Sequence, residues 1–488
     1  MVPKLPWILS FTLINIGVVS FLAACNSVQS SVTPTSISRV VPVAIPSPPP
    51  LPLILSPAIS DPETTQKVQD YLKRLKLPGI PSQPNGIWIQ TGQTLLANEQ
   101  GTTPLGAASL TKVATSLVAL QTLGVDYQYI TEISITGEVK NGILNGDLWL
   151  QGGGDPFLVW EEAIALGNLL NQIGIKKVNG NLIISDKFYM NFETDPIKSG
   201  ELWREAINAN TWSGEAEAAY TNLSSKAPPT PAPPSTLNSV TVLTPSPTTS
   251  PNTLPSLNPA PTAKPQVVIT GNVKTGATIP ANAQLILRHY SPPLTELVKK
   301  MNQYSNNPMA EMIADSVGGG KVVAKKAAVA IEVPEVEIQL ENGSGLSPKN
   351  LISPRAVVGL FLALDKLMAA NNLSIADTLT IIGQDSGVLE SRPLPPNTIA
   401  KSGTLNTVSA LGGVLPTEKH GLVWFAVLNN GDIDLDKARR EQETFLATLL
   451  KDWQPAKIIP AQLTASATRK NKTSRSEVLK YLNSTPLQ

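Results

Sequence analysis

The chain has 488 residues, a formal net charge of +1 and 15% charged residues. This length predicts two or more domains, and the near-neutral charge without a basic stripe argues against a nucleic-acid partner. One cysteine and two histidines exclude an intramolecular disulfide and a four-ligand Cys/His zinc site.

The first 25 residues resemble a bacterial lipoprotein signal. Lys4 precedes an uncharged, mostly apolar run from Leu5 to Leu22, as in a secretory signal. The run ends Leu22-Ala23-Ala24-Cys25, which resembles a lipobox, so we expect Cys25 to be lipidated. An uncleaved membrane anchor is the alternative, and both place the remainder outside the cytoplasmic membrane.

Two proline-rich tracts interrupt the chain. Residues 26–60 are rich in Ser, Thr and Pro, and we interpret them as a tether that reaches on the order of 100 Å. A second tract at 226–266 has the same character and too few apolar residues to form a core, so we expect it to be disordered.

The folded body is expected to begin at residue 61. Asp61 and Pro62 are a helix cap and a first helical residue, and an apolar stripe with helical spacing follows. Residues 87–96 have the alternation and central turn of a β-hairpin.

Ser109-Leu110-Thr111-Lys112 then opens a predicted helix that ends at Gly124. Lys112 lies one helical turn after Ser109, so its amine can reach the serine hydroxyl. A serine nucleophile needs an adjacent base, and a lysine with a lowered pKa can supply one. The alternative is a helix-capping serine followed by a solvated lysine.

From 126 to 290 the pattern changes to short alternating runs separated by turns, which predicts a β-rich insertion. Helical patterns return after 290 and recur around 357–367. Strands are predicted over 404–411 and 422–428, then a helix around 445–450 and a polar tail from 456 to 488.

Two later triplets can complete a lysine-based serine site. Ser305-x-Asn307 offers a hydroxyl and an amide, and Lys401-Ser402-Gly403 offers a cation, a hydroxyl and a flexible glycine. Lys198-Ser199-Gly200 also fits the second pattern, but it precedes Ser305 and lies within the insertion, so we interpret it as a chance match. Both histidines, His289 and His420, are interpreted as structural.

In this order the three motifs resemble the penicillin-recognising serine enzymes. The gap of 196 residues between Ser109 and Ser305 resembles the D-alanyl-D-alanine carboxypeptidase/endopeptidase family of the penicillin-binding protein 4 type. Segments 123–127, 153–156, 343–347 and 387–392 are also similar, and the resemblance spans roughly 61–452. This chain has Asn306 and Ser402 where the family commonly has Asp and Thr.

The resemblance implies an α/β (α+β) fold. A β-lactamase/transpeptidase-like domain, with an antiparallel sheet flanked by helices, would comprise residues 61–125 and 291–455. A β-rich inserted domain would occupy 126–290.

The resemblance also implies catalytic roles for the first two motifs. Ser109 would attack the carbonyl between two D-alanines and form an acyl-enzyme, and Lys112 would take its proton. Ser305 would pass that proton to the leaving D-alanine, and Asn307 would hold the peptide amide.

The third motif would bind the substrate. Lys401 would lower the pKa of Lys112 and attract the terminal carboxylate, assisted by the Ser402 hydroxyl. Gly403 would let the substrate approach the backbone, and the amides of Ser109 and Thr404 would form an oxyanion hole. No cofactor or metal is expected.

The implied substrate is a peptidoglycan peptide ending in D-Ala-D-Ala, with β-lactams as inhibitors. The protein would be extracytoplasmic or periplasmic and would meet the membrane only through its lipid anchor. A β-lactamase of the same fold is an alternative, against which the long insertion counts. A non-catalytic wall-binding lipoprotein is another, which would be expected to have lost Ser109 or Lys112.

Overall fold

The computed structural model describes residues 61–76, 83–92, 94–226, 263–466 and 475–482. The expected signal segment with Cys25, the tether at 26–60 and most of the tract at 226–266 lie outside these residues. Among the described helices, none is both long enough and apolar enough to cross a bilayer.

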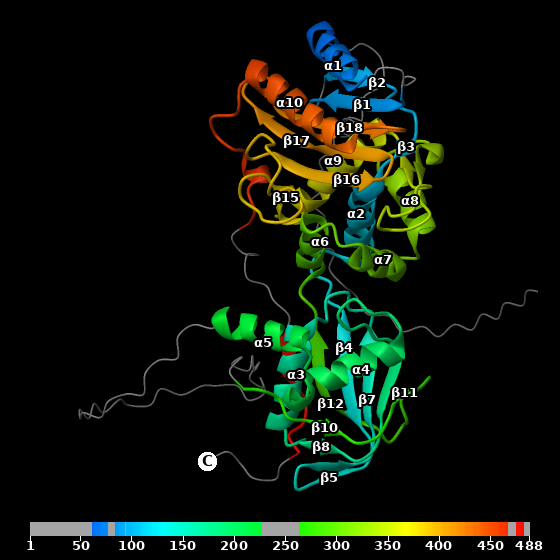
Figure 1. Ribbon diagram of the computed structural model, residues 1–488. Helices are drawn as coiled ribbons and strands as arrows, with labels where there is room; N and C mark the ends of the chain where they lie inside the picture. The colour runs from blue at the N-terminus through cyan, green and yellow to red at the C-terminus, as the bar shows by residue number, and fades with distance from the viewer. Residues whose placement is uncertain (1–60, 77–82, 93, 227–262, 467–474, 483–488) are drawn as a thin grey trace, which may run out of the picture. The chain divides into compact units, whose positions relative to one another are not determined.

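A six-stranded antiparallel sheet is the centre of the larger core (Figure 1). Its strands come from both sides of the insertion, so segments far apart along the chain share one sheet. In spatial order they are β15 (Thr380–Ile381), β16 (Ile399–Leu405), β17 (Val408–Thr417), β18 (Gly421–Asn430), β1 (Asn85–Gln90) and β2 (Leu95–Glu99).

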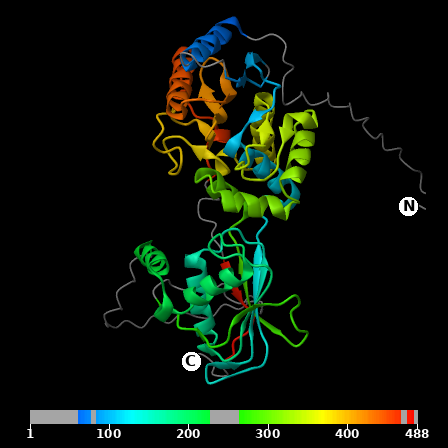
Figure 2. The ribbon, with the colours of Figure 1, turned by 45° about the vertical axis from the view of Figure 1, so that its right-hand side comes forward.

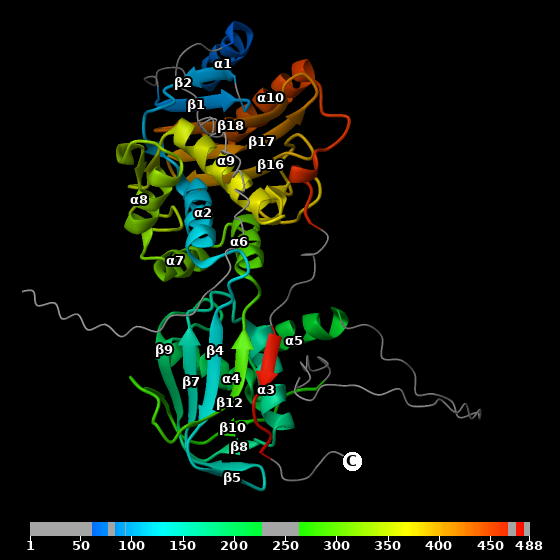
Figure 3. The ribbon, with the colours of Figure 1, turned by 180° about the vertical axis from the view of Figure 1, so that it is seen from behind.

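Helices cover both faces of this sheet. On one face lie α1 (Pro62–Leu75) and α10 (Leu435–Trp453), and on the other lie α2 (Thr111–Leu123), α8 (Gly320–Ala330) and α9 (Pro354–Ala370), as Figures 1 and 3 show. β17 is buried along its whole length, which is expected of a strand covered on both faces. The expected cap of α1 is confirmed, because the Asp61 carboxylate accepts the Thr64 amide at 2.8 Å.

The segments around α2 are short and irregular. A 3-10 turn, η1 (Ala108–Leu110), leads into α2, and a three-stranded sheet joins β3 (Leu105–Gly106), β14 (Leu351–Ile352) and β13 (Ile338–Gln339). Two helices follow the insertion, α6 (Leu294–Gln303) and α7 (Asn307–Ser316). Further 3-10 turns are η3 (Glu335–Glu337), η4 (Ile375–Asp377) and η5 (Ala461–Leu463).

The inserted segment has its own hydrophobic core. One sheet, in the order β11 (Val273–Thr275), β9 (Leu182–Lys187), β7 (Leu148–Gly153), β4 (Ile130–Ile135), β12 (Gln284–Tyr290) and β19 (Arg475–Val478), mixes parallel and antiparallel pairs. A smaller sheet contains β10 (Val268–Ile269), β8 (Lys177–Val178), β6 (Ile143–Asn145) and β5 (Glu138–Lys140). The Asn141-Gly142 turn joins β5 to β6, and both its residues have the positive φ that such a turn requires.

The insertion also contains helices that the sequence pattern did not predict. They are α3 (Trp160–Gln172), α4 (Pro196–Ala206) and α5 (Gly214–Lys226), drawn in shades of green in Figure 2. A 3-10 turn, η2 (Ala209–Thr211), lies between α4 and α5. Most residues of α3 are buried, so its apolar residues extend around the helix and give little amphipathic periodicity.

Two further segments differ from expectation. The predicted strand at 404–411 is in fact the junction of β16 and β17, so Lys401 lies within a strand and not before one. The segment expected as a polar tail contributes β19, which pairs with β12, because tertiary pairing supplies the partners that its own sequence does not indicate.

Candidate active site

Ser109 lies in the tight turn η1 at the start of α2, and its side chain is partly exposed while both neighbours are buried. Ala108 has φ 46°, a left-handed conformation that is uncommon for alanine and is held here by close packing. A Cβ on Gly345 would lie 1.8 Å from the Ala108 carbonyl oxygen, and one on Gly403 would lie 2.8 Å from the Ser109 nitrogen. Two glycines from distant segments therefore fix the turn that presents Ser109.

Lys112 is fully buried, and its amine contacts three oxygen atoms. Nζ lies 2.9 Å from Ser109 Oγ, 2.7 Å from Asn307 Oδ1 and 2.7 Å from the backbone carbonyl oxygen of Ser344. The two carbonyl oxygens can only accept hydrogen bonds. A neutral amine can give its two hydrogens to them and keep its lone pair for the Ser109 hydroxyl.

Burial lowers the pKa of Lys112 from 10.5 to about 7, against the opposing effect of the Glu311 carboxylate, which raises it. A lysine with this pKa is substantially neutral near pH 7 and can accept a proton. The geometry and the pKa together equip Lys112 to serve as the base for Ser109.

The second lysine, Lys401, is also fully buried and lies beside Ser305. Its Nζ donates to Ser305 Oγ at 2.9 Å and to the Ser402 carbonyl at 2.8 Å. Burial lowers the pKa of Lys401 well below its ordinary value, and the positive charge of Lys112 lowers it further. The structure thus brings the two lysines close enough for their charges to interact.

Ser305 and Asn307 lie at the junction of α6 and α7. Ser305 has φ 53°, and the Asn306 side chain caps α7 by accepting the Met309 amide at 2.9 Å. The side-chain carbonyl oxygen of Asn307 accepts a hydrogen bond from Lys112, so its NH₂ group can donate to a ligand.

A buried side chain ties this junction to α2. Asn302 donates to Ser116 Oγ at 2.9 Å and to the Thr378 carbonyl at 3.0 Å, and Ser116 in turn donates to the Lys112 carbonyl at 2.7 Å. These bonds set the end of α6 against the helix that carries Lys112.

The remaining candidate residues lie along β16. Gly403 is buried against the Ser109 turn, Ser402 is partly exposed, and Thr404 is exposed with its hydroxyl accepting from Arg439 at 3.3 Å. The strand therefore passes directly beside the nucleophile turn and offers backbone groups there.

The competing motif lies elsewhere. Lys198 is in α4 of the insertion, largely exposed, and forms an ion pair at 4.0 Å with Glu193. His289 is buried with Nδ1 3.0 Å from Ser476 Oγ, and the His420 ring packs edge-on against Trp453. None of these contacts involves the Ser109 cluster.

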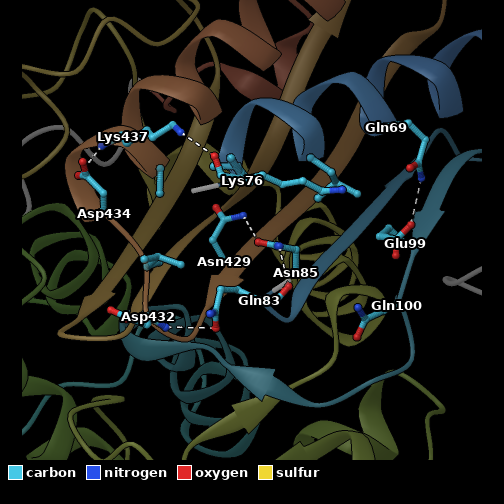
Figure 4. A pocket seen from close by; sticks show the side chains of 14 residues that line it. Gln69, Lys76, Gln83, Asn85, Glu99, Gln100, Asn429, Asp432, Asp434 and Lys437 are labelled. Atoms are coloured by element: carbon cyan, nitrogen blue, oxygen red, sulfur yellow. Dashed lines mark hydrogen bonds between the residues drawn. The ribbon is translucent and has the colours of Figure 1, made fainter. Parts of the chain in front are cut away.

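A cavity of about 440 Å³ also lies away from this cluster, between α1 and α10 (Figure 4). Its lining includes Asn85, Asn429 and Lys437 but none of the predicted site residues. This cavity therefore does not coincide with the Ser109 cluster.

Two contributors to the site were not found by sequence reasoning. The Ser344 carbonyl contacts Lys112, and the Glu311 carboxylate holds the loop that carries Ser344. Backbone carbonyls have no signature in a sequence, and Glu311 is one of many helical glutamates, so only the folded chain identifies them.

Two relatives of this chain are D-alanyl-D-alanine carboxypeptidases. The chain is 24% identical over 398 residues to D-alanyl-D-alanine carboxypeptidase DacB of Haemophilus influenzae, covering 69% of this chain and 83% of that protein. It is 26% identical over 472 residues to a D-alanyl-D-alanine carboxypeptidase of Actinomadura sp., covering 77% and 84%.

Solved structures share the fold. A penicillin G-acylated predatory endopeptidase from Bdellovibrio bacteriovorus matches with a TM-score of 0.62 and 19% identity, covering 80% of this chain and 99% of that one. Penicillin-binding protein 4 of Haemophilus influenzae matches with a TM-score of 0.54 and 21% identity over the same shares.

The family model described as D-Ala-D-Ala carboxypeptidase 3 (S13) matches residues 65–211 and 262–451. These two ranges contain Ser109, Lys112, Ser305, Asn307 and Lys401 and leave out most of the second proline-rich tract. The chain belongs to the D-Ala-D-Ala carboxypeptidase 3 (S13) family.

Proposed function

We propose that this chain is a serine D,D-peptidase that cleaves the bond after the first D-alanine of peptidoglycan stem peptides, as carboxypeptidase or endopeptidase. The observation that carries the proposal is the contact between the buried Lys112 amine and the Ser109 hydroxyl, at 2.9 Å. Membership of the S13 family supplies the substrate class.

Acylation begins when Ser109 Oγ attacks the scissile carbonyl while its proton moves to the neutral amine of Lys112. Negative charge then develops on the carbonyl oxygen. The amides of Ser109 and Thr404 would donate to that oxygen, a contribution of about 3 kcal/mol for each donor in comparable sites.

Collapse of the intermediate breaks the C–N bond and leaves an ester on Ser109. The leaving amine needs a proton, which Lys112 gives up by way of the Ser305 hydroxyl. Lys401 contacts Ser305 at 2.9 Å and can orient this hydroxyl. Water then attacks the ester, restores the Ser109 hydroxyl and releases the shortened peptide.

Substrate orientation would come from the groups left available around the nucleophile. The Asn307 NH₂ would donate to a peptide carbonyl. Lys401 and the Ser402 hydroxyl would attract the terminal carboxylate, and the absence of a side chain at Gly403 would let the peptide lie along β16. β-Lactams, which present a similar carbonyl and carboxylate, would acylate Ser109.

We propose, in addition, that the two segments flanking the insertion, 61–125 and 291–455, act as one catalytic domain. Cys25 would carry a lipid that anchors the protein outside the cytoplasmic membrane. The apolar run and the Leu-Ala-Ala-Cys sequence support the anchor. Replacing Cys25 by Ala should shift the protein from the membrane fraction to the soluble extracytoplasmic fraction, whereas unchanged fractionation would contradict it.

The function is tested with a soluble form that begins after the tether. We expect stable labelling by a fluorescent penicillin and release of D-alanine, or of a cross-linked peptide, from defined muropeptides. Rapid turnover of the label would instead indicate a β-lactamase, and the absence of labelling would indicate a non-catalytic protein.

The matched controls use the repeated Lys-Ser-Gly triplet. Ser109→Ala should abolish labelling, and Lys401→Ala should reduce acylation by at least about a hundredfold, as loss of a positioned acid–base partner commonly does. Lys198→Ala, in the same triplet within the insertion, should leave the rate unchanged. An equal loss in both lysine variants would overturn the assignment.

A further inference from the structure

The loop at 342–345 forms one wall beside Lys112. Ser344 is fully buried, and its carbonyl accepts from Lys112 Nζ at 2.7 Å. Gly345 has φ +85° and packs against the Ala108 carbonyl, so the loop also contacts the nucleophile turn. Any shift of this loop would therefore move both the Ser344 carbonyl, which contacts Lys112, and Gly345, which packs against the turn that carries Ser109.

Glu311 fixes this loop through both oxygens of its carboxylate. Oε2 accepts the Gly343 amide at 2.9 Å, and Oε1 accepts the Ser344 amide at 3.0 Å. Hydrogen bonds to an ionised carboxylate are stronger than those between neutral groups. The side chain is partly buried, so solvent competes less with these two bonds than at a fully exposed site.

Glu311 also lies one helical turn after Asn307 on α7, so the two side chains share one face of that helix. Asn307 Oδ1 accepts from the Lys112 amine at 2.7 Å. Glu311 acts on the same amine indirectly, because it accepts the amide of Ser344, whose carbonyl contacts Lys112. A single rigid helix therefore sets two of the three oxygen atoms around the base.

The charge of Glu311 acts on Lys112 as well. The negative charge of Glu311, on α7, raises the pKa of Lys112. Lys401, on β16, also lies near this amine, and the charge of Lys112 lowers the pKa of Lys401. Without the Glu311 charge, burial would lower the pKa of Lys112 further, so less of the amine would be protonated at a given pH. It could then take the Ser109 proton but would hold it poorly until the leaving amine needs it.

We propose that Glu311 is a positioning residue for the general base. Its hydrogen bonds to the loop orient the Ser344 carbonyl toward Lys112, and its negative charge favours the protonated form of the Lys112 amine. This inference rests on the proposed function. Glu311 makes no contact with the reacting atoms, and its effect passes through the loop and through its charge.

The test measures the second-order rate constant for penicillin acylation against pH in the wild type and in Glu311→Gln. Glutamine keeps the size of the side chain but loses the charge and one acceptor. We expect the midpoint of the acid limb to move to lower pH by at least about half a unit, because an attractive charge has been removed. We also expect a lower plateau, because one loop amide loses its acceptor.

Asp315→Asn is the matched control, since it removes the same charge one turn farther along α7 from an exposed position. It should leave both midpoint and plateau unchanged. A Glu311→Gln profile with a lower plateau but the wild-type midpoint would indicate a structural clamp only and overturn the electrostatic part. A profile identical to wild type would overturn the proposal.

Glu311→Asp keeps the question testable if the glutamine variant does not fold. Aspartate retains the charge but reaches the loop less well, so the plateau should fall while the midpoint stays. A shifted midpoint here would contradict the proposal. If the wild type itself is not acylated, the proposed function fails, which is distinct from any of these outcomes.

Discussion

The burial of Lys112 predicts a specific pH dependence for acylation. Its pKa of about 7 means that the amine becomes protonated as the pH falls through neutrality. A protonated amine cannot accept the Ser109 proton. We therefore expect the acylation rate constant to fall about tenfold for each pH unit below 7 and to level off above about 8.

The magnitude follows from the two pKa values. An ordinary lysine, at 10.5, is less than about a thousandth neutral at pH 7, whereas Lys112, at about 7, is roughly half neutral. The folded environment thus supplies roughly a thousandfold more of the reactive form. In free energy this shift corresponds to about 5 kcal/mol. The interactions that fold the site supply this free energy.

The assay is fluorescent penicillin labelling of the soluble form, at constant ionic strength, from about pH 5 to about pH 9. Ser109→Ala supplies the blank. Lys112→Arg keeps a cation but cannot act as a base, so it should be inactive throughout this range. A wild-type rate that is flat from pH 5 to 8, or that still rises tenfold per unit at pH 9, would refute the reasoning.

Three further predictions concern packing and stability. Gly403→Ala should reduce acylation severely, because its Cβ would lie 2.8 Å from the Ser109 nitrogen, and an unchanged rate would contradict the close approach. Asn302→Leu should lower the free energy of unfolding by about 1–3 kcal/mol in urea denaturation, since the buried Thr378 carbonyl loses a donor; full stability would argue against that bond. The folded pKa of Lys112, about 7, lies below its ordinary 10.5, so the unfolded chain binds more protons between these values. The free energy of unfolding should therefore rise with pH across that window, by at most about 5 kcal/mol, and rise less in Lys112→Met.

The sequence by itself determined the elements whose signals are local. The Asp61-Pro62 start of α1, the hairpin of β1 and β2 and the Gly124 stop of α2 each depend on neighbouring residues, and all three are confirmed. Ser109 and Lys112 are close for the same reason, because they are one helical turn apart.

Elements that depend on their surroundings were missed or misplaced. The helix α3 is buried on most sides, which removes the periodicity that identifies a surface helix. The strand β19 forms by pairing with β12, and its own sequence does not indicate this. The ends of β16 and β17 are set by their pairing register. Propensity is weak in such segments, and tertiary contacts override it.

Only the tertiary structure decided which of the two Lys-Ser-Gly lysines lies near Ser109 and Lys112. Motif order favoured Lys401 over Lys198, but burial, the contact with Ser305 and the interaction with Lys112 exist only once β16 lies against α2. The contact of the Ser344 carbonyl with Lys112 and that of the Glu311 carboxylate with the Ser344 amide likewise form only in the folded chain. A pKa depends on desolvation and on charges brought together from distant segments, and those are properties of the folded chain and not of any local pattern.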